Sequence, residues 1–138
     1  DSMPFSNESF DIIFTKSFIE HFYFPEDIIK ISYNLLKKGG VLITLTPEWR
    51  YHFKDFYDDY THRTPFTKTS LMDIQLIHNF DEIKVESFKQ LPSTWGKYKN
   101  FSKTFSEVLR LLLPDSIKKK SKFIKFSKEI MLLSYAKK

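Results

Sequence analysis

A strand, a helix and a second strand follow one another early in the sequence, and this pattern constrains the fold most. Residues 10–14, "FDIIF", and residues 41–46, "VLITLT", are short apolar runs rich in β-branched side chains. Such runs are typical of strands that are covered on both faces. Between them, Pro25 suits the first position of a helix, and the pair Gly39–Gly40 is expected to end it. The sequence therefore predicts a right-handed parallel crossover in an α/β sheet.

The rest of the chain supplies one long loop and several further predicted elements. They are an aromatic and charged loop over residues 47–66, a helix from Thr67 to about His78 with Leu71, Ile74 and Ile77 on one face, a strand over 80–88, an amphipathic helix over 101–113 and a final strand over 129–138. This alternation predicts a mostly parallel, three-layer α/β fold. The first strand has no earlier strand to pair with, so we expect sheet to be missing on its outer side.

Charge and cysteine content narrow the class of protein. Residues 97–138 carry 12 Lys and Arg against 3 Asp and Glu, whereas residues 1–96 carry 10 against 14. We therefore divide the chain into an α/β core part over residues 1–96, a basic helical insertion over 97–128 and the final strand over 129–138. The absence of cysteine excludes disulfides, Cys-ligated zinc and thiol catalysis. It fits a cytoplasmic location.

Several short motifs occur in an order that resembles a known family. They are Met3-Pro4-Phe5, Ser9-Phe10-Asp11, Glu20-His21, Leu36-Lys37-Lys38-Gly39-Gly40, "DDYTHRTPFT" over residues 58–67 and "EIMLLSYAKK" over residues 129–138. Together they resemble the second half of a class I S-adenosylmethionine-dependent methyltransferase of the small-molecule, type 11-like kind. Lys38 stands where this family usually has proline, and the arginine of the "DDYTHRTPFT" motif is displaced.

The resemblance implies a fold and a cofactor. The fold is the C-terminal half of a Rossmann-like methyltransferase sheet, mostly parallel with the last strand antiparallel. The cofactor of the complete protein is S-adenosylmethionine. The sequence contains only Gly39, Gly40 and Gly96, so it has no G-x-G loop for the methionine part of that cofactor. The first strands and the glycine-rich loop are therefore missing, and we expect this chain alone to be inactive.

Two groups of residues follow the first predicted strand. By resemblance, Thr15, Lys16 and Ser17 run past the methionine end of the cofactor; otherwise they form an ordinary loop. Glu20 and His21 are candidate catalytic residues, with His21 as a general base, because imidazole accepts a proton near neutral pH. The alternative is that both residues only hold the loop by hydrogen bonds.

The aromatic loop supplies candidate substrate-binding residues, and half of its aromatic side chains would otherwise pack on the sheet. The candidates are Trp49, Tyr57, Asp59, His62, Arg63 and Phe66. Asp59 would pair with Arg63 or orient His62. A metal site could also be read from the spacing of His52, Asp55, Asp58, Asp59 and His62. Such spacing arises readily by chance in a loop, so we expect no metal.

The basic segment and the function each keep alternatives. The lysines Lys118–Lys120, Lys122, Lys125 and Lys128, with Phe123 and Phe126 between them, suit a solvated face, an anionic membrane surface or nucleic acid. The acidic first part argues against nucleic acid. We expect a methyltransferase fragment that acts on a small molecule, with sugar, lipid-linked and quinone-like acceptors left open. The alternative is a non-catalytic, degenerate methyltransferase-like module that binds a protein partner or an anionic membrane.

Overall fold

A computed structural model describes residues 4–90, 104, 108, 112 and 130–138. The chain forms two compact units, one of residues 1–87 and 132–138 and the other of residues 88–131. The basic lysine cluster and most of the predicted helix over 101–113 lie outside the described residues. Within that helix, Thr104, Val108 and Leu112 are described, and they are helical. None of the helices that can be described is long and apolar enough to span a membrane.

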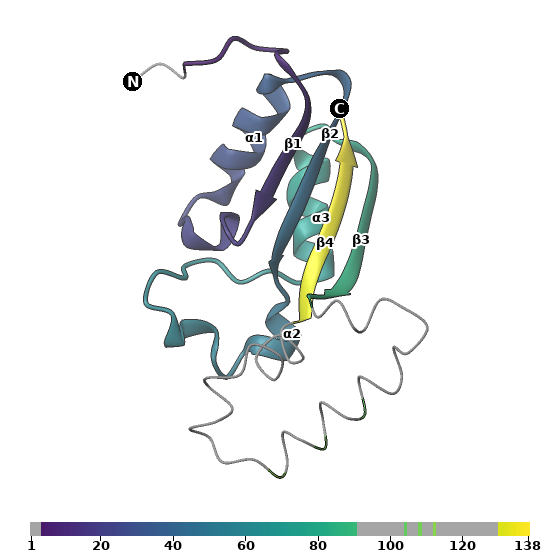
Figure 1. The fold of residues 1–138 in the computed structure, drawn as a ribbon. Helices are drawn as coiled ribbons and strands as arrows, with labels where there is room; N and C mark the ends of the chain where they lie inside the picture. The colour runs from purple at the N-terminus through teal and green to yellow at the C-terminus, as the bar shows by residue number, and fades with distance from the viewer. Residues whose placement is uncertain (1–3, 91–103, 105–107, 109–111, 113–129) are drawn as a thin grey trace. The chain divides into compact units, whose positions relative to one another are not determined.

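Four strands form one sheet, whose order is β1-β2-β4-β3. They are β1 (Phe10–Lys16), β2 (Leu36–Pro47), β3 (Asp81–Lys89) and β4 (Ile130–Lys137). β1 and β2 are parallel, with Ile13 opposite Leu42 and Thr15 opposite Thr44. β4 runs in the opposite direction to its neighbours (Figure 1). The predicted sheet, mostly parallel with its last strand antiparallel, is confirmed.

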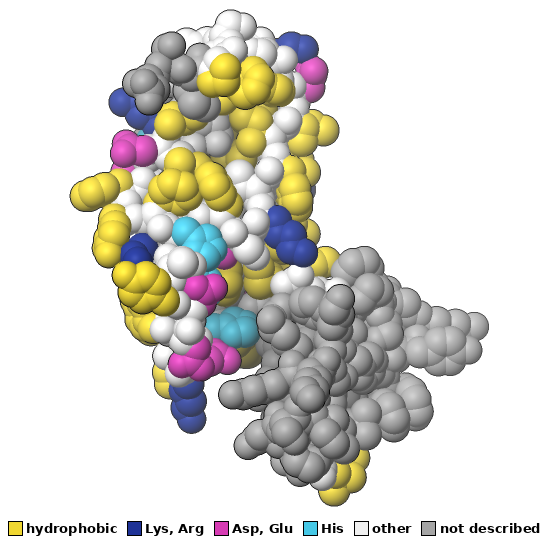
Figure 2. All heavy atoms as spheres, turned by 60° about the vertical axis from the view of Figure 1, so that its left-hand side comes forward, with side chains coloured by type: hydrophobic (Ala, Val, Ile, Leu, Met, Phe, Trp, Pro, Cys, Tyr) yellow, Lys and Arg dark blue, Asp and Glu magenta, His cyan; other side chains and the backbone are white. Residues whose placement is uncertain are grey.

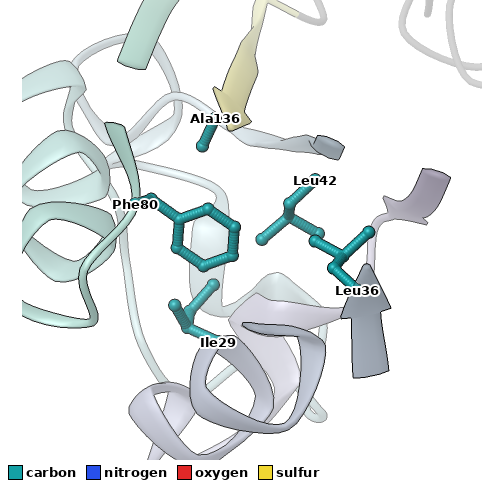
Figure 3. Close-up of a cluster of buried hydrophobic side chains, with 5 residues drawn as sticks. All are labelled: Ile29, Leu36, Leu42, Phe80 and Ala136. Atoms are coloured by element: carbon teal, nitrogen blue, oxygen red, sulfur yellow. The ribbon is translucent and has the colours of Figure 1, made fainter. Parts of the chain in front are cut away.

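Two helices pack on one face of this sheet. They are α1 (Pro25–Leu35) and α3 (Lys68–Ile77). One core cluster joins Ile29 of α1 to Leu42 of β2, Phe80 and Ala136 of β4 (Figure 3). A second joins Leu71 of α3 to Ile19, Phe66 and Leu132. Shorter helices lie in the connections: η1 (Ile19–His21), α2 (Trp49–His52) and η2 (Phe56–Asp58).

The prediction of a third layer is wrong for the part of the chain that the structure describes. Both crossovers, β1-α1-β2 and β2-α3-β3, step across the sheet in the same direction. Right-handed connections then place both helices on the same face. On the other face, Ile12 and Phe14 of β1 are 61% and 59% exposed. The run "FDIIF" is therefore covered on one face, not on two.

The expected helix end at Gly39–Gly40 is also wrong. α1 ends at Leu35, and β2 begins at the next residue. The register between β1 and β2 shifts here, from Phe10 opposite Leu36 to Ile12 opposite Val41. Gly39 has a φ of +80°, and a Cβ atom at Gly40 would lie 2.9 Å from the carbonyl oxygen of Lys37. The two glycines therefore allow an irregular, bulged start of β2 against β1.

The predicted start of α3 is confirmed, and one residue of its buried face is corrected. Thr67 is the N-cap and forms a capping box with Ser70. Ile77 is 74% exposed, whereas Gln75 is buried and accepts a hydrogen bond of 2.7 Å from Ser134. Residues 71, 74 and 75 share a face at helical spacing, and residue 77 points away from it.

Candidate functional site

The predicted cofactor residues lie where β1 ends. The hydroxyl of Thr15 donates to that of Thr44 across the two strands, at 3.3 Å. Lys16 is exposed, and Ser17 turns the chain with a φ of 46° while its amide donates to the carbonyl of Leu45. Ligands of open α/β sheets bind beyond the carboxyl ends of parallel strands. Thr15, Lys16 and Ser17 therefore occupy the end of the sheet where a ligand is expected.

Glu20 lies in η1, just beyond this end of the sheet, and its side chain is fully buried. Its Oε2 accepts a hydrogen bond of 2.8 Å from the hydroxyl of Thr46, at the end of β2. Its Oε1 has no hydrogen-bond partner among the described residues. The backbone carbonyl of Glu20 accepts from the amides of Arg63 and Thr64, at 2.8 and 3.0 Å. These bonds fix the aromatic loop against η1.

A hydrogen-bond chain sets the orientation of His21. The Thr61 hydroxyl lies 2.6 Å from Oδ1 of Asp59 and 2.9 Å from Nδ1 of His21. Hydrogen bonds from Thr61 lower the pKa of Asp59, so its carboxylate accepts the hydroxyl proton. Thr61 has no second proton to give, so Nδ1 of His21 is the donor to Thr61. In the neutral imidazole, Nε2 of His21 then carries the free lone pair.

His62 has the same tautomer for a simpler reason. Its Nδ1 lies 2.6 Å from the carbonyl oxygen of Phe56. A carbonyl oxygen only accepts, so Nδ1 carries the proton and Nε2 of the neutral ring is free. The rings of His21 and His62 lie 4.9 Å apart between centroids. One ligand atom from each of Glu20, His21 and His62 lies within 4.8 Å of the others.

The structure therefore brings the predicted catalytic pair together with one predicted substrate-binding residue, His62. Asp59 stands beside this group, with Oδ2 3.8 Å from Nε2 of His62. Arg63 does not fill the predicted role of a partner for Asp59. Its guanidinium lies over the rings of Tyr23 and Tyr60, at 5.2 and 5.1 Å from their centroids. It also donates to the carbonyl oxygens of Tyr60 and His62.

The aromatic candidates separate into two places. Trp49 and Tyr57 pack edge to face around Phe56, with centroids 5.5 and 5.1 Å from its ring. Phe56 also contacts the ring of His62 at 4.5 Å, so this aromatic group adjoins the histidines. Phe66 lies apart from them, buried in the core beside Leu71.

Sequence reasoning missed the three threonines that support the site. Thr46 binds the Glu20 carboxyl group, Thr61 binds His21, and Thr64 donates to the carbonyl of Phe22 at 2.7 Å. The sequence could have identified Thr46 as a site residue, because Thr46 stands at the carboxyl end of a predicted parallel strand. The spacing motif from His52 to His62 separates into two pairs in the structure: His52 with Asp55 at 3.5 Å, and His62 with Asp59.

Beside the site, the sheet edge at β1 and the adjoining face that turns away from the helices are apolar and exposed. Figure 2 brings this side of the molecule forward and shows hydrophobic side chains gathered over it, with histidine and acidic side chains below them. Ile12 and Phe14 come from β1, and the exposed Tyr23 and Phe24 come from the segment before α1. An apolar surface of this kind is typical of a place where other polypeptide packs.

Comparisons with known proteins bear on the fold of this chain. Residues 1–44 match a family model described as a methyltransferase domain. No curated protein matches the sequence significantly.

Three solved structures illustrate the similarity of fold. A SAM-dependent methyltransferase from Archaeoglobus fulgidus has a TM-score of 0.64 and 19% identity, over 97% of this chain and 62% of that protein. One from Thermotoga maritima has a TM-score of 0.62 and 20% identity, over 99% and 60%. A phosphoethanolamine N-methyltransferase from Haemonchus contortus, bound to S-adenosyl-L-methionine, has a TM-score of 0.57 and 16% identity, over 96% and 34%.

The chain thus spans less than two thirds of the length of each of these proteins. Likeness at such low identity establishes the fold, and the family model adds a sequence match for residues 1–44. The fold is therefore that of class I S-adenosylmethionine-dependent methyltransferases, and residues 1–44 are similar in sequence to a methyltransferase domain.

Proposed function

We propose that this chain carries the acceptor side of an S-adenosylmethionine-dependent methyltransferase and that further polypeptide, packed on β1, completes the cofactor site. The observation that carries this proposal is the exposure of Ile12 and Phe14 beside the sheet end that holds Thr15–Ser17. Burying a side chain of this size is worth about 1.5–3 kcal/mol. An apolar strand at the edge of a sheet is also a template for pairing with a further strand.

The glycine-rich loop would come from that further polypeptide. The sequence has only three glycines, and two of them form the bulge at the start of β2. S-Adenosylmethionine, when bound, would supply the methyl group. Thr15, Lys16 and Ser17 would contact its methionine end from the carboxyl end of β1.

The residues around η1 would handle the acceptor. Methyl transfer depends mainly on aligning a nucleophile with the sulfonium methyl group. The free Nε2 of His21 suits removal of a proton from an acceptor O–H or N–H group. The Trp49–Phe56–Tyr57 group would enclose the apolar part of a small molecule. Sugar-like, lipid-linked and quinone-like acceptors all fit this description.

Cofactor binding and methyl transfer by two forms of the protein test the proposal. One form is the isolated 138-residue chain, and the other carries further polypeptide joined ahead of Asp1 that includes a glycine-rich cofactor loop. We expect S-adenosylhomocysteine binding, measured by calorimetry, only in the extended form. In that form Phe14→Lys should abolish binding, whereas Ile77→Lys, at an even more exposed position on α3, should not.

Two results would contradict the proposal. Cofactor binding or turnover by the isolated chain would show that no further polypeptide is needed. An extended form that packs on β1 but does not bind S-adenosylhomocysteine would instead support the non-catalytic module.

A further inference from the structure

We propose that Glu20, His21 and His62 bind a divalent transition-metal ion of the zinc class. The proposal goes beyond methyl transfer and does not depend on it, but an ion bound here would take the Nε2 lone pair of His21, so His21 would not act as a general base while the ion is bound. It starts from placement: η1 supplies a carboxyl group and an imidazole, and the aromatic loop supplies a second imidazole. Atoms that bind zinc lie about 2.0–2.2 Å from it, so tetrahedral geometry puts them about 3.4 Å apart. One ligand atom from each residue lies within 4.8 Å of the other two, so these atoms would have to come closer by up to about 1.4 Å to hold an ion.

Both imidazoles are oriented as metal ligands usually are. A ligating histidine typically donates its other ring N–H to a carboxylate, a carbonyl or a similar oxygen, which fixes the tautomer. Nδ1 of His62 donates to the carbonyl of Phe56, and Nδ1 of His21 donates to the hydroxyl of Thr61. Asp59 in turn accepts from Thr61, which completes a carboxylate–hydroxyl–imidazole chain. Both Nε2 atoms therefore keep their lone pairs for an ion.

The third proposed ligand, Glu20, has a carboxyl oxygen without a hydrogen-bond partner among the described residues. Glu20 is fully buried, and Thr46 satisfies only its Oε2. Oε1 has no partner among the described residues. A buried polar atom without a partner is costly, and native proteins rarely keep one without a reason. A cation at this place would satisfy Oε1.

The scaffold holds these groups in place before any ion binds. His21 and His62 are 41 positions apart in sequence, and backbone hydrogen bonds from Arg63 and Thr64 to the Glu20 carbonyl connect their segments. Thr64 adds a bond to the carbonyl of Phe22. A site whose ligands are already positioned loses less conformational entropy when the ion binds.

The donor atoms select the class of ion. Two imidazole nitrogens and one carboxyl oxygen suit zinc and its neighbours in the first transition row, and three protein ligands leave a position open for water or another molecule. Magnesium and calcium prefer sets made of oxygen atoms. The competing interpretation is that His62 simply pairs with Asp59, which lies 3.8 Å away.

Metal titration of the full 138-residue chain tests the proposal. The protein would be freed of metal and of any histidine tag and then titrated with zinc by calorimetry. Cobalt absorption would report the geometry. We expect one equivalent of zinc to bind, and cobalt to give the intense visible bands of a four-coordinate site. Glu20→Gln and His62→Gln should each weaken binding at least tenfold, and so should Thr61→Val, because it removes the oxygen that orients His21.

His78→Gln is the matched control. The Nδ1 atom of His78 lies 2.8 Å from the carbonyl of Ile74, as in His62, but His78 does not belong to the cluster. This variant should bind zinc like the parent chain. Circular dichroism would confirm that each variant is folded, and any one folded variant of the three is sufficient. Absence of saturable zinc binding by the parent chain, or unchanged binding in the folded variants, would overturn the proposal.

Discussion

Replacing Thr46 by valine should destabilise the protein through a single lost hydrogen bond. Thr46 and Glu20 are both fully buried, and the Thr46 hydroxyl lies 2.8 Å from Oε2 of Glu20. Oε1 already lacks a partner in the described part of the chain. The substitution would leave the whole carboxyl group of Glu20 buried without a side-chain hydrogen-bond donor.

The size of the effect follows from this burial. Leaving a buried polar group without its partner costs about 1–3 kcal/mol, and more where the group is charged. Valine has nearly the volume of threonine and suits a β-strand, so packing and strand propensity change little. We therefore expect the free energy of unfolding to fall by about 2 kcal/mol.

Thr44→Val provides a matched control on the same strand and the same face. Thr44 is as deeply buried as Thr46, but its partner is the neutral, partly buried hydroxyl of Thr15, at 3.3 Å. Its replacement should cost less than about 1 kcal/mol. Both variants would be measured by urea unfolding with a metal chelator present, so that ion binding does not contribute. Equal losses for the two variants would refute the reasoning.

A double-mutant cycle assigns the effect to the pair. In a Glu20→Leu background, Thr46→Val has no carboxyl group left to affect. The coupling energy between the two positions should therefore exceed about 1 kcal/mol, within the range of groups in direct contact. A coupling energy near zero would mean that Thr46 stabilises the protein in another way.

Three further substitutions test the fold, each measured by urea unfolding. Phe80→Ala removes the ring that contacts Ile29 and Leu42 in the core and should cost about 3–5 kcal/mol, against less than about 0.5 kcal/mol for Ile77→Ala at an exposed position. Thr67→Ala removes the N-cap of α3 and should cost about 1 kcal/mol, whereas Thr69→Ala, inside the first turn, should not. Gly40→Ala places a Cβ atom 2.9 Å from the carbonyl oxygen of Lys37 and should lower the free energy of unfolding by about 1–3 kcal/mol. Lys38→Ala, at an exposed position, is its control. An unchanged stability of Gly40→Ala would contradict the close contact between residue 40 and Lys37.

The regular elements were predictable because their signals are local. Pro25 begins α1 and Thr67 caps α3, as the sequence indicates. The end of α1 was not predictable from Gly39–Gly40, because glycine permits both a helix cap and a bulge. The bulge was selected by the pairing with β1, which is a tertiary contact. Helical spacing alone did not decide the exposure of Ile77, since residue 77 lies three positions after residue 74 but far around the helix from residues 71 and 75.

The candidate site was predictable only in part. Glu20 and His21 were identified from their position after a strand, and His62 from its motif. The sequence could not predict that these three side chains lie close together, because the loop between them has no periodicity that fixes its path. The path is set by backbone hydrogen bonds to Glu20 and by the threonine side chains. The same limitation explains why the sequence spacing of His52 to His62 did not indicate which groups come together.

The central position of β4 has a consequence for how the protein is made. β2 and β3 are not neighbours, and the place between them is filled only by residues 130–137. A nascent chain on the ribosome therefore carries two strands with open inner edges until this segment emerges. Leu132 and Ala136 complete both core clusters, so neither cluster closes earlier. We expect released chains that stop before residue 130 to bind chaperones and to be cleaved rapidly by proteases, and chains that include residues 130–137 to resist cleavage.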